Sequence, residues 1–291
     1  EKGKINSNKS HEGLFPRMWS SDNAVNYLNY YGFLDFEIKS EYKNESQIIE
    51  LVDSFKSRIA DDDIDADDYH EFLSNFGSYL DIEKPSLFSN ISYFINFQLG
   101  KMYFRYFMWN FSGRQNDKQW KYDLENGNWI SGINIIDEYR LGPQKNLPSD
   151  VINNKARNQY YLIPFILGII GLIFIFKKNL RIFWPIFLLF IFTGIALKFY
   201  LNERVFEPRE RDYALVGSFY TYCIFIGFSF IAISEYFLKY LKNTFSFLLT
   251  IAITITSPIL LSFNNWDDHD RSNRYTAQTL AKAYLDSIDK D

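Results

Sequence analysis

The stretch that decides the fold is an apolar run of 26 residues, YALVGSFYTYCIFIGFSFIAISEYFL, at Tyr213–Leu238, whose single charge is Glu235. A helix needs about 20 apolar residues to cross the hydrocarbon core of a membrane. Three further runs are nearly free of charge: Tyr160–Phe176, Leu180–Leu201 and Phe245–Phe263. Soluble helices rarely stay apolar on every side over four consecutive elements. The sequence therefore predicts an α-helical integral membrane protein with four transmembrane helices, in preference to buried helical hairpins in a soluble protein.

Charge divides the chain into segments of different character. Residues 1–159 carry 18 Lys and Arg against 24 Asp and Glu, whereas residues 160–263 carry only 9 basic and 5 acidic side chains. These counts, with the single cysteine Cys223, exclude a disordered chain, a disulfide scaffold and a basic nucleic-acid binder. We expect four segments: a mostly helical extracytoplasmic α+β segment at 1–84, aromatic interfacial helices with a motif loop at 85–159, the four-helix transmembrane region at 160–263, and an extracytoplasmic loop with the start of a helix at 264–291.

The links between the apolar runs predict how the chain is oriented. Lys177–Asn179 and Lys239–Thr244 contain basic residues and no acid, whereas Asn202–Asp212 mixes three Arg with four acidic residues. Loops rich in Lys and Arg stay in the cytoplasm. Lys177–Asn179 and Lys239–Thr244 are therefore expected inside, and the middle link Asn202–Asp212, residues 1–159 and residues 264–291 are expected outside. Since such a long polar segment needs something upstream to carry it across, we expect the chain to be a fragment of a longer multipass protein.

The N-terminal segment shows the patterns of a small folded α+β unit. Phe33–Lys39 alternates between apolar and polar residues as a strand does, and Glu45–Ala60 has helical spacing. A second helix is expected after the acidic run Asp61–Asp68, with an apolar stripe that extends from Tyr69 to Leu80. The acidic run lacks the Gly and Glu of an EF-hand calcium loop. We therefore expect its carboxylates to lie at the N-terminus of that helix, where the helix dipole stabilises negative charge.

Pro85–Phe111 is dense in aromatic residues that polar ones interrupt. It is too polar to span a membrane comfortably and too apolar to be fully solvated. Two interpretations remain open for it. One is a pair of amphipathic helices in the headgroup layer, where Tyr and Trp are enriched. The other is an ordinary aromatic core helix.

Three polar clusters border the apolar segments on the predicted outer side. The first is the motif loop Arg114, Gln115, Asn116 and Asp117, and the second contains Arg209 and Arg211 at the start of the third run. Arginine guanidinium groups and the N-termini of helices both bind phosphate, so a lipid phosphate could bind at Arg209 and Arg211. The alternative is a loop in which the two arginines pair with Glu210 and Asp212.

The third cluster, at the exit of the fourth run, holds Asp267, Asp268 and His269. Carboxylates with imidazole can bind a divalent cation or supply a general base. Adjacent carboxylates cannot all point at one centre, so at most two of them could be ligands. A solvated turn before the next helix is the alternative.

Five stretches together resemble a family of multipass envelope proteins of Gram-negative bacteria that is catalogued as a domain of unknown function and is similar to protein O-mannosyltransferase-like proteins. The stretches are KPSLFSN at Lys84–Asn90, RYFMWNFSGRQND at Arg105–Asp117, GNWISG at Gly127–Gly132, PRERDYA at Pro208–Ala214 with GSFY at Gly217–Tyr220, and NWDDHDRS at Asn265–Ser272. The resemblance covers residues 14–20 and 84–285.

This resemblance implies a C-type glycosyltransferase of the bacterial inner membrane. Such an enzyme transfers a sugar from a polyprenyl-phosphate carrier to an extracytoplasmic acceptor protein. Arg209 and Arg211 would then hold the carrier phosphate, and Asp267, Asp268 or His269 would position the acceptor or a divalent cation. The catalytic acid is expected upstream of this chain, so no catalytic residue is assigned.

Two other functions compete with this interpretation. The first is a non-catalytic envelope scaffold or assembly factor, in which the polar clusters only hold loops together. The second is a transporter, which is disfavoured because Lys198 and Glu235 lie near span ends, where their charges can reach water.

Overall fold

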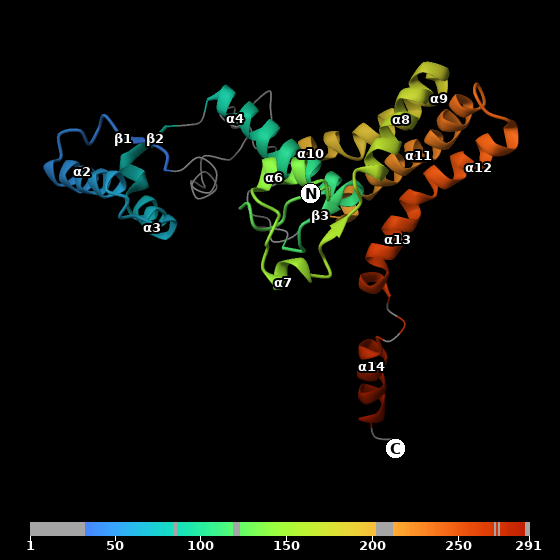
Figure 1. Ribbon diagram of the computed structural model, residues 1–291. Coiled ribbons are helices and arrows are strands. Elements are labelled where there is room, and N and C mark those ends of the chain that lie inside the picture. Colours follow the sequence, from blue (N-terminus) through green and yellow to red (C-terminus); the bar gives the residue numbers. More distant parts are fainter. Residues whose placement is uncertain are drawn as a thin grey trace, which may run out of the picture. The chain divides into compact units, whose positions relative to one another are not determined.

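The computed structural model describes residues 33–83, 86–118, 123–201, 212–270, 272 and 274–288, and it is mostly helical (Figure 1). Its contacts divide the chain into two compact units, which we describe separately. The first unit contains Glu1–Phe107, Lys118–Tyr122 and Asn179–Cys223, and the second contains Met108–Asp117, Asp123–Lys178 and Ile224–Asp291.

The first unit begins with a small α/β core. Strand β1 (Phe36–Ile38) pairs antiparallel with β2 (Leu80–Ile82), and helices α2 (Ser46–Ala60) and α3 (Ala66–Phe76) follow β1 along the chain. The rings of Phe55 and Phe72 stack with centroids 3.7 Å apart. The Tyr69 hydroxyl donates to the Leu34 carbonyl at 3.0 Å. The buried residues of this core are Phe36, Val52, Phe55, Ile64, Tyr69, Phe72 and Leu80.

The predicted strand and both helices of this core are confirmed, with one correction at the end of the second helix. The Asp65 side chain accepts from the backbone N–H groups of Asp67 and Asp68 at 2.9 Å, so part of the acidic run caps α3, as expected. Leu80, however, does not continue the helical stripe. The chain passes through a 3₁₀ turn, η2 (Gly77–Tyr79), and Leu80 enters the same core from β2.

The aromatic segment is helical from α4 (Leu87–Tyr93) through the π-helix η3 (Phe94–Arg105) to α5 (Tyr106–Phe111). Within the first unit, the Phe107 ring contacts Tyr222 with centroids 4.7 Å apart and Phe190 at 6.0 Å. The Tyr103 hydroxyl lies 2.7 Å from the Ser218 hydroxyl. These buried contacts are those of a core helix, and the placement of the segment at a membrane surface stays a prediction.

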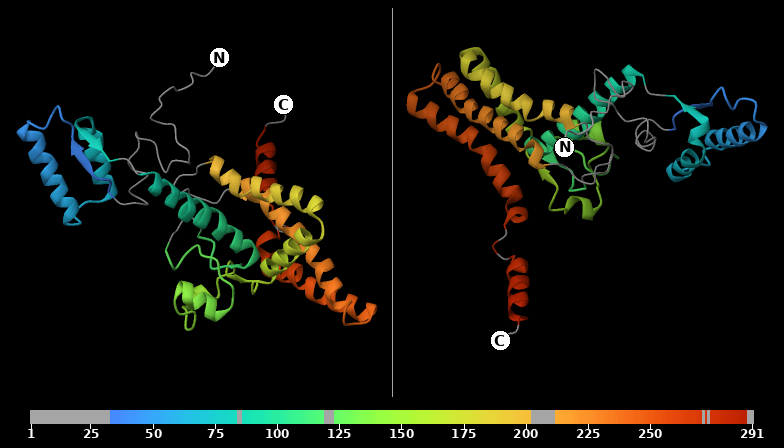
Figure 2. Two further views of the ribbon diagram at one scale, coloured as in Figure 1. Left: turned by 90° about the horizontal axis from the view of Figure 1, so that it is seen from above. Right: turned by 180° about the vertical axis from the view of Figure 1, so that it is seen from behind.

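Among the residues that the structure describes, three helical stretches are long and apolar enough to cross a membrane, judged by length and composition: Leu180–Leu201, Tyr213–Phe237 and Asn243–Trp266. The first consists of α9 (Leu180–Phe192) and α10 (Ile195–Leu201), and the second lies within α11 (Asp212–Phe237). The third consists of α12 (Asn243–Thr254) and α13 (Thr256–His269), which follow one another as one bent helix (Figure 2).

The remaining predicted span corresponds to α8 (Ile163–Lys178), which has 16 residues. At 1.5 Å per residue it is about 24 Å long, so four spans stay a prediction. The apolar run begins at Tyr160, but the helix does not. Tyr161 and Leu162 have positive φ values of 53° and 60°, and the Tyr160 N–H donates to the Ser112 carbonyl at 2.9 Å. These residues therefore belong to the segment that leads into α8.

In the second unit, α8 runs parallel to α11. A Cβ at Gly171 would overlap the Phe225 carbonyl group, so the two backbones touch there. Seven residues further along α8, the Lys178 Nζ lies 2.8 Å from both carboxylate oxygens of Glu235. Since residue numbers rise in the same direction along both helices, they point the same way.

The rest of the second unit contains a two-stranded sheet, short helices and a C-terminal helix. Strands β3 (Gly113–Arg114) and β4 (Asn158–Gln159) pair antiparallel. Helices α6 (Asn134–Leu141) and α7 (Ser149–Ile152) lie between them in the sequence, and α14 (Thr276–Asp286) follows α13.

Candidate functional site

The site is built around the short sheet of β3 and β4. Gly113 has φ +142°, and a Cβ at this position would overlap the carbonyl oxygens of Asn158 and Ile130. Glycine is therefore required where β3 passes between its neighbours. Arg114 pairs with Asn158 on one side and forms a bridge with Trp129 on the other. The sheet thus joins the motif loop to the residues that precede α8.

Two of the predicted motif-loop residues use their side chains to shape the loop. The Gln115 Oε1 accepts from the Asn128 N–H at 3.2 Å, and its Nε2 donates to the Leu124 carbonyl at 3.0 Å. The Asn116 Oδ1 accepts from the Gly127 N–H at 2.9 Å. Both amides are buried. Their role is structural, whereas Asp117 in the same loop is exposed.

Two arginines of this region, Arg114 and Arg140, lie over tryptophan rings. The Arg114 Cζ lies 5.3 Å from the Trp109 ring centre, and the Arg140 Cζ lies 3.5 Å from that of Trp129. Arg140 also donates from Nη1 to the Trp129 carbonyl at 3.0 Å. Such cation–π contacts each contribute about 0.5–2 kcal/mol, depending on how far the pair is desolvated. Arg140 is thus held against the sheet.

Asp137, which sequence reasoning did not single out, is a buried carboxylate with 3% of its surface exposed. Its two oxygens accept from the Ser131 and Gly132 N–H groups, both at 2.8 Å, and from the Ser131 hydroxyl at 3.0 Å. Burial lowers the pKa values of Arg140 and Arg157, and the charge of Asp137 opposes this effect on both. Asp137 therefore fixes the turn before α6 and stabilises the two nearby cations.

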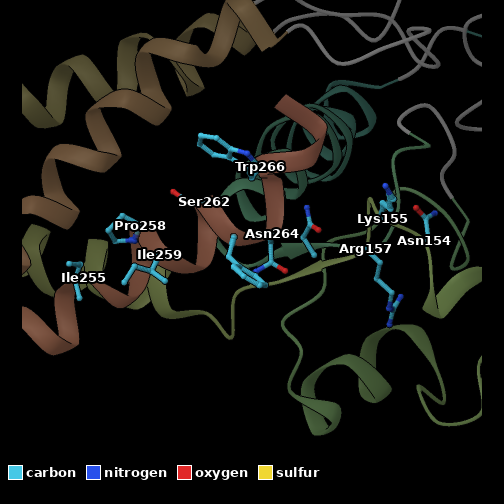
Figure 3. Close-up of a pocket in the computed structure, with 11 residues that line it drawn as sticks. Asn154, Lys155, Arg157, Ile255, Pro258, Ile259, Ser262, Asn264 and Trp266 are labelled. Atoms are coloured by element: carbon cyan, nitrogen blue, oxygen red, sulfur yellow. The ribbon is translucent and has the colours of Figure 1, made fainter. Parts of the chain in front are cut away.

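Beside the sheet, an open groove of about 820 Å³ runs between α13 and the segment that leads into β4 (Figure 3). One wall comes from α13 and from Ile255, the residue directly before it, and is mainly apolar, with Pro258, Ile259, Phe263 and Trp266. The other wall is polar and basic. It contains Asn154, Lys155, Arg157 and Asn158, while Ser262 and Asn264 add polar groups from α13. The groove therefore combines an apolar wall with a cationic one.

Hydrogen bonds through Asn265 hold the two walls together. Asn158 donates from Nδ2 to the Asn265 Oδ1 at 3.0 Å, and Asn265 donates from its own Nδ2 to the Tyr160 hydroxyl at 2.8 Å. These residues are more than 100 positions apart in the chain. The end of α13 is thereby attached to β4 and to the entry of α8.

Arg157 retains hydrogen-bonding capacity. Its Nη2 donates to the Gln144 Oε1 at 3.0 Å, while its Nη1 is buried and has no hydrogen-bond partner among the described residues. Lys155 is exposed, and the two side chains leave the segment in different directions (Figure 3). A guanidinium remains protonated at neutral pH even when its pKa is lowered by burial. The groove therefore carries two positive charges.

The structure brings only part of the predicted site to this groove. Arg209 and Arg211 lie outside the described residues. Asp267, Asp268 and His269 form the last turn of α13, directly after Trp266, and only their backbone is described. No group of three or more His, Cys, Asp or Glu side chains that could hold a metal ion occurs in the part of the chain that the structure describes.

Sequence reasoning missed Lys155, Arg157 and the role of Asn158. A signal was present, because two basic residues and three Asn crowd into Asn153–Asn158, just before an apolar run. Sequence reasoning also placed Lys198 near a span end, where its charge could reach water. In the structure Lys198 lies in α10 with 1% of its surface exposed, so it is buried. Glu235 is paired with Lys178.

A family model described as a family of unknown function, DUF8416, matches residues 1–95. No curated protein and no solved structure matches the chain. The matched region lies mostly before residues 84–285, on which the resemblance to O-mannosyltransferase-like proteins mainly rests. That resemblance therefore stays a prediction.

Proposed function

We propose that this chain is the membrane core of a polyprenyl-phosphate-sugar-dependent protein glycosyltransferase, and that the groove along α13 binds the lipid-phosphate donor. The observation that carries this proposal is the composition of the groove. An apolar wall on a helix long enough to cross a membrane faces a wall that holds Lys155 and Arg157. A lipid with an anionic headgroup is complementary to both walls, because its hydrocarbon chain fits the apolar wall and its headgroup fits the basic wall.

The dimensions and chemistry of the groove suit such a lipid. From Thr256 to Trp266, α13 rises by about 15 Å at 1.5 Å per residue, which accommodates a stretch of extended hydrocarbon. At the other wall, the positive charges of Lys155 and Arg157 attract a phosphate. A hydrogen bond between charged groups contributes about 1.5–3 kcal/mol, or roughly tenfold to a hundredfold in affinity.

The direction of the helices supports the predicted orientation. Two parallel helices of one chain that both cross a membrane need a span between them, and Leu180–Leu201 can supply it. Lys178 and Glu235 meet at the end next to the basic links, whereas Tyr160 and Asn265 meet at the opposite end. We propose four spans in a bacterial inner membrane, with the groove and the two terminal segments on the periplasmic side.

The catalytic part of the proposal rests on the resemblance. An acceptor protein would approach from the same side as the groove, where Asp267, Asp268 and His269 follow Trp266. We propose that one or two of these side chains position the acceptor or a divalent cation. Arg209 and Arg211 remain candidates for a second contact to the carrier phosphate.

Polyprenyl-phosphate binding by the full-length protein in lipid nanodiscs tests the donor site. Arg157→Gln should weaken binding about tenfold to a hundredfold, and Arg157→Lys should restore part of the loss because the charge remains without the fork. Gln144→Ala is the matched control, since it removes the Arg157–Gln144 hydrogen bond and leaves the charge. Melting temperatures are measured in parallel.

The same assay separates the alternatives. If Arg157→Gln and Gln144→Ala lower the melting temperature equally and neither changes lipid affinity, Arg157 serves the fold and the donor site is wrong. Arg209→Gln and Arg211→Gln form a second pair of variants, which tests the phosphate contact predicted from the sequence. If only these two variants lose affinity, the phosphate binds at Arg209 and Arg211 and not in the groove.

A non-catalytic envelope scaffold is the second candidate, and the motif loop favours it. The amides of Gln115, Asn116 and Asn128 are engaged with the loop itself, in the manner of a structural element. A glycoproteomic comparison of cells with and without the full-length gene separates the two functions. If the chain belongs to an enzyme, some glycopeptides should be missing from cells without the gene. If it belongs to a scaffold, the set of glycopeptides should be unchanged.

A further inference from the structure

Helix α6 exposes apolar side chains and buries charged ones. Ile135 has 82% of its surface exposed and Tyr139 has 92%. These two residues are one turn apart, so their side chains share one face of the helix. Asp137 lies two positions from each of them, on the opposite face, and it is buried. Arg140, one turn after Asp137, is held on the inner side by its contact with the Trp129 ring.

This arrangement is the reverse of that in a helix on the surface of a soluble protein, whose apolar stripe faces the core and whose charged residues face water. The inner face of α6 cannot turn outward without loss of its hydrogen bonds, because the Asp137 carboxylate accepts from the Ser131 and Gly132 N–H groups. A single exposed apolar side chain is common, but here a whole helix face is apolar. The outer face of α6 therefore fits surroundings that are less polar than water.

Hydrogen bonds hold the start of α6 near the end of a candidate membrane span. Asn265, the last residue but one of the span Asn243–Trp266, donates to the Tyr160 hydroxyl at 2.8 Å. The next residue, Tyr161, donates its N–H to the Ser131 carbonyl at 2.9 Å, three residues before α6 begins. Tyr161 is itself exposed, and tyrosine is enriched where membranes meet water. The exposed face of α6 thus lies close to the point where the span would leave the lipid.

We propose that α6 lies on the lipid surface on this side of the membrane, with Ile135 and Tyr139 inserted between the headgroups. An interfacial helix buries its apolar face about 5–10 Å into the boundary between headgroups and acyl chains. Tyrosine suits this layer, because its ring is apolar and its hydroxyl can reach water. The inference goes beyond the proposed function, since it uses neither the groove nor the residues that would bind the donor.

Spin labels on full-length protein in nanodiscs of phosphatidylcholine and phosphatidylglycerol test this placement. Ile135→Cys and Tyr139→Cys, each in a Cys223→Ser background, carry the nitroxide. Its collisions are measured with oxygen, which concentrates in lipid, and with a nickel chelate, which stays in water. Both labels should collide mainly with oxygen. Lys145→Cys is the matched control, because it is an exposed polar position just beyond α6, and its label should collide mainly with the chelate.

Two results would overturn the inference. If the labels at Ile135 and Tyr139 collide with the chelate as often as the label at Lys145 does, α6 lies in water. If they collide weakly with both reagents, protein covers this face, and a second copy of the chain or another protein is its partner.

A label within a span separates this inference from the rest of the membrane proposal. Leu188 is exposed in the candidate span Leu180–Leu201, so Leu188→Cys should prefer oxygen. A preference for the chelate at Leu188 would remove the span from the lipid, and the inference would fail with it. If oxygen is preferred at Leu188, Ile135 and Tyr139 while polyprenyl phosphate does not bind, the donor site fails and the inference stands.

Tyr139→Trp decides if a cysteine variant lowers the melting temperature, because it keeps an aromatic ring at this position. Its fluorescence is compared with that of wild type, which has the same six other tryptophans. Lipids brominated on their acyl chains should quench the added fluorescence. Added fluorescence that these lipids leave unquenched would reject the contact with the lipid surface.

Discussion

At the scale of single residues, Gly113 shows how much of the site depends on one missing side chain. Its φ of +142° and the two carbonyl oxygens beside its Cα exclude any larger residue without movement of the backbone. We expect Gly113→Ala to lower the free energy of unfolding by about 1–3 kcal/mol. Thermal unfolding in a fixed detergent measures this change.

Gly77 supplies the control for that prediction. It has a right-handed helical conformation, and nothing lies within 4 Å of the position of a Cβ. Gly77→Ala should therefore be neutral or stabilising by up to about 1 kcal/mol. Equal effects at the two glycines would show that β3 tolerates a side chain and that the sheet is less tightly built than described.

The free energy of unfolding of the N-terminal core should depend on pH in the alkaline range because Tyr69 is buried there. Burial raises the pKa of Tyr69 to about 12, against the opposing effect of its hydrogen bond to Leu34. An unfolded tyrosine titrates near pH 10. Between about pH 10 and 12 the unfolded state has lost a proton that the native state keeps, so the free energy of unfolding should fall by about 1.4 kcal/mol per pH unit. Below pH 10 the stabilisation is fully present.

Urea unfolding of the segment 33–83 at pH 8, 10 and 11 checks this dependence, because every residue of that core lies within the segment. Tyr69→Phe should be less stable at pH 8 by about 1 kcal/mol, since it loses one hydrogen bond. Its stability should then fall less steeply above pH 10. A slope equal to that of wild type would assign the alkaline effect to other groups.

At the scale of elements, the close packing of α8 against α11 can be tested by mutation. Small residues let helices approach closely in membranes, and Gly171 occupies such a position against Phe225. Gly171→Leu should separate the pair, lower the melting temperature and weaken the Lys178–Glu235 contact. A disulfide between Lys178→Cys and Glu235→Cys, in a Cys223→Ser background, reports that contact.

Gly227 in α11 is the matched control, because the position of its Cβ has nothing within 4 Å. Gly227→Leu should leave the yield of the disulfide unchanged. Undiminished cross-linking in Gly171→Leu would mean that the two helices do not depend on this glycine.

Residue patterns predicted the elements better than their ends. Alternation and helical spacing were sufficient for β1, α2 and α3, because each pattern reflects burial on one face of a single element. Leu80 and Tyr160 were assigned to the wrong elements. An apolar side chain that reaches the core from a strand or a turn has the same spacing as one that continues a helix, and only the tertiary fold separates these cases.

The groove lay beyond sequence reasoning for a different reason. It depends on the hydrogen bond between Asn158 and Asn265, which joins parts of the chain that no local pattern connects. The sequence did point to the neighbourhood through the cluster that begins at Asn265. It could not show that Gln115 and Asn116 hold a loop, since a buried structural amide and a binding amide have the same residue type.

At the scale of the whole molecule, the proposed topology can be tested by labelling. Single cysteines at Lys145, between α6 and α7, and at Asn179, between α8 and α9, should react from opposite sides of the membrane in a Cys223→Ser background. Both are surface positions outside the groove. Labelling of both from the same side would contradict an odd number of spans between them, and the placement of the groove would fail with it.

The apolar wall of the groove belongs mainly to α13, which lies in a candidate membrane span, and the groove is open to its surroundings. A lipid of the proposed kind would therefore arrive by sideways diffusion within one leaflet and would never need to enter water. Its encounter with the protein would take place in two dimensions. Occupancy would then follow the mole fraction of that lipid among its neighbours, so dilution with other lipids would empty the site, whereas a larger volume of buffer would not.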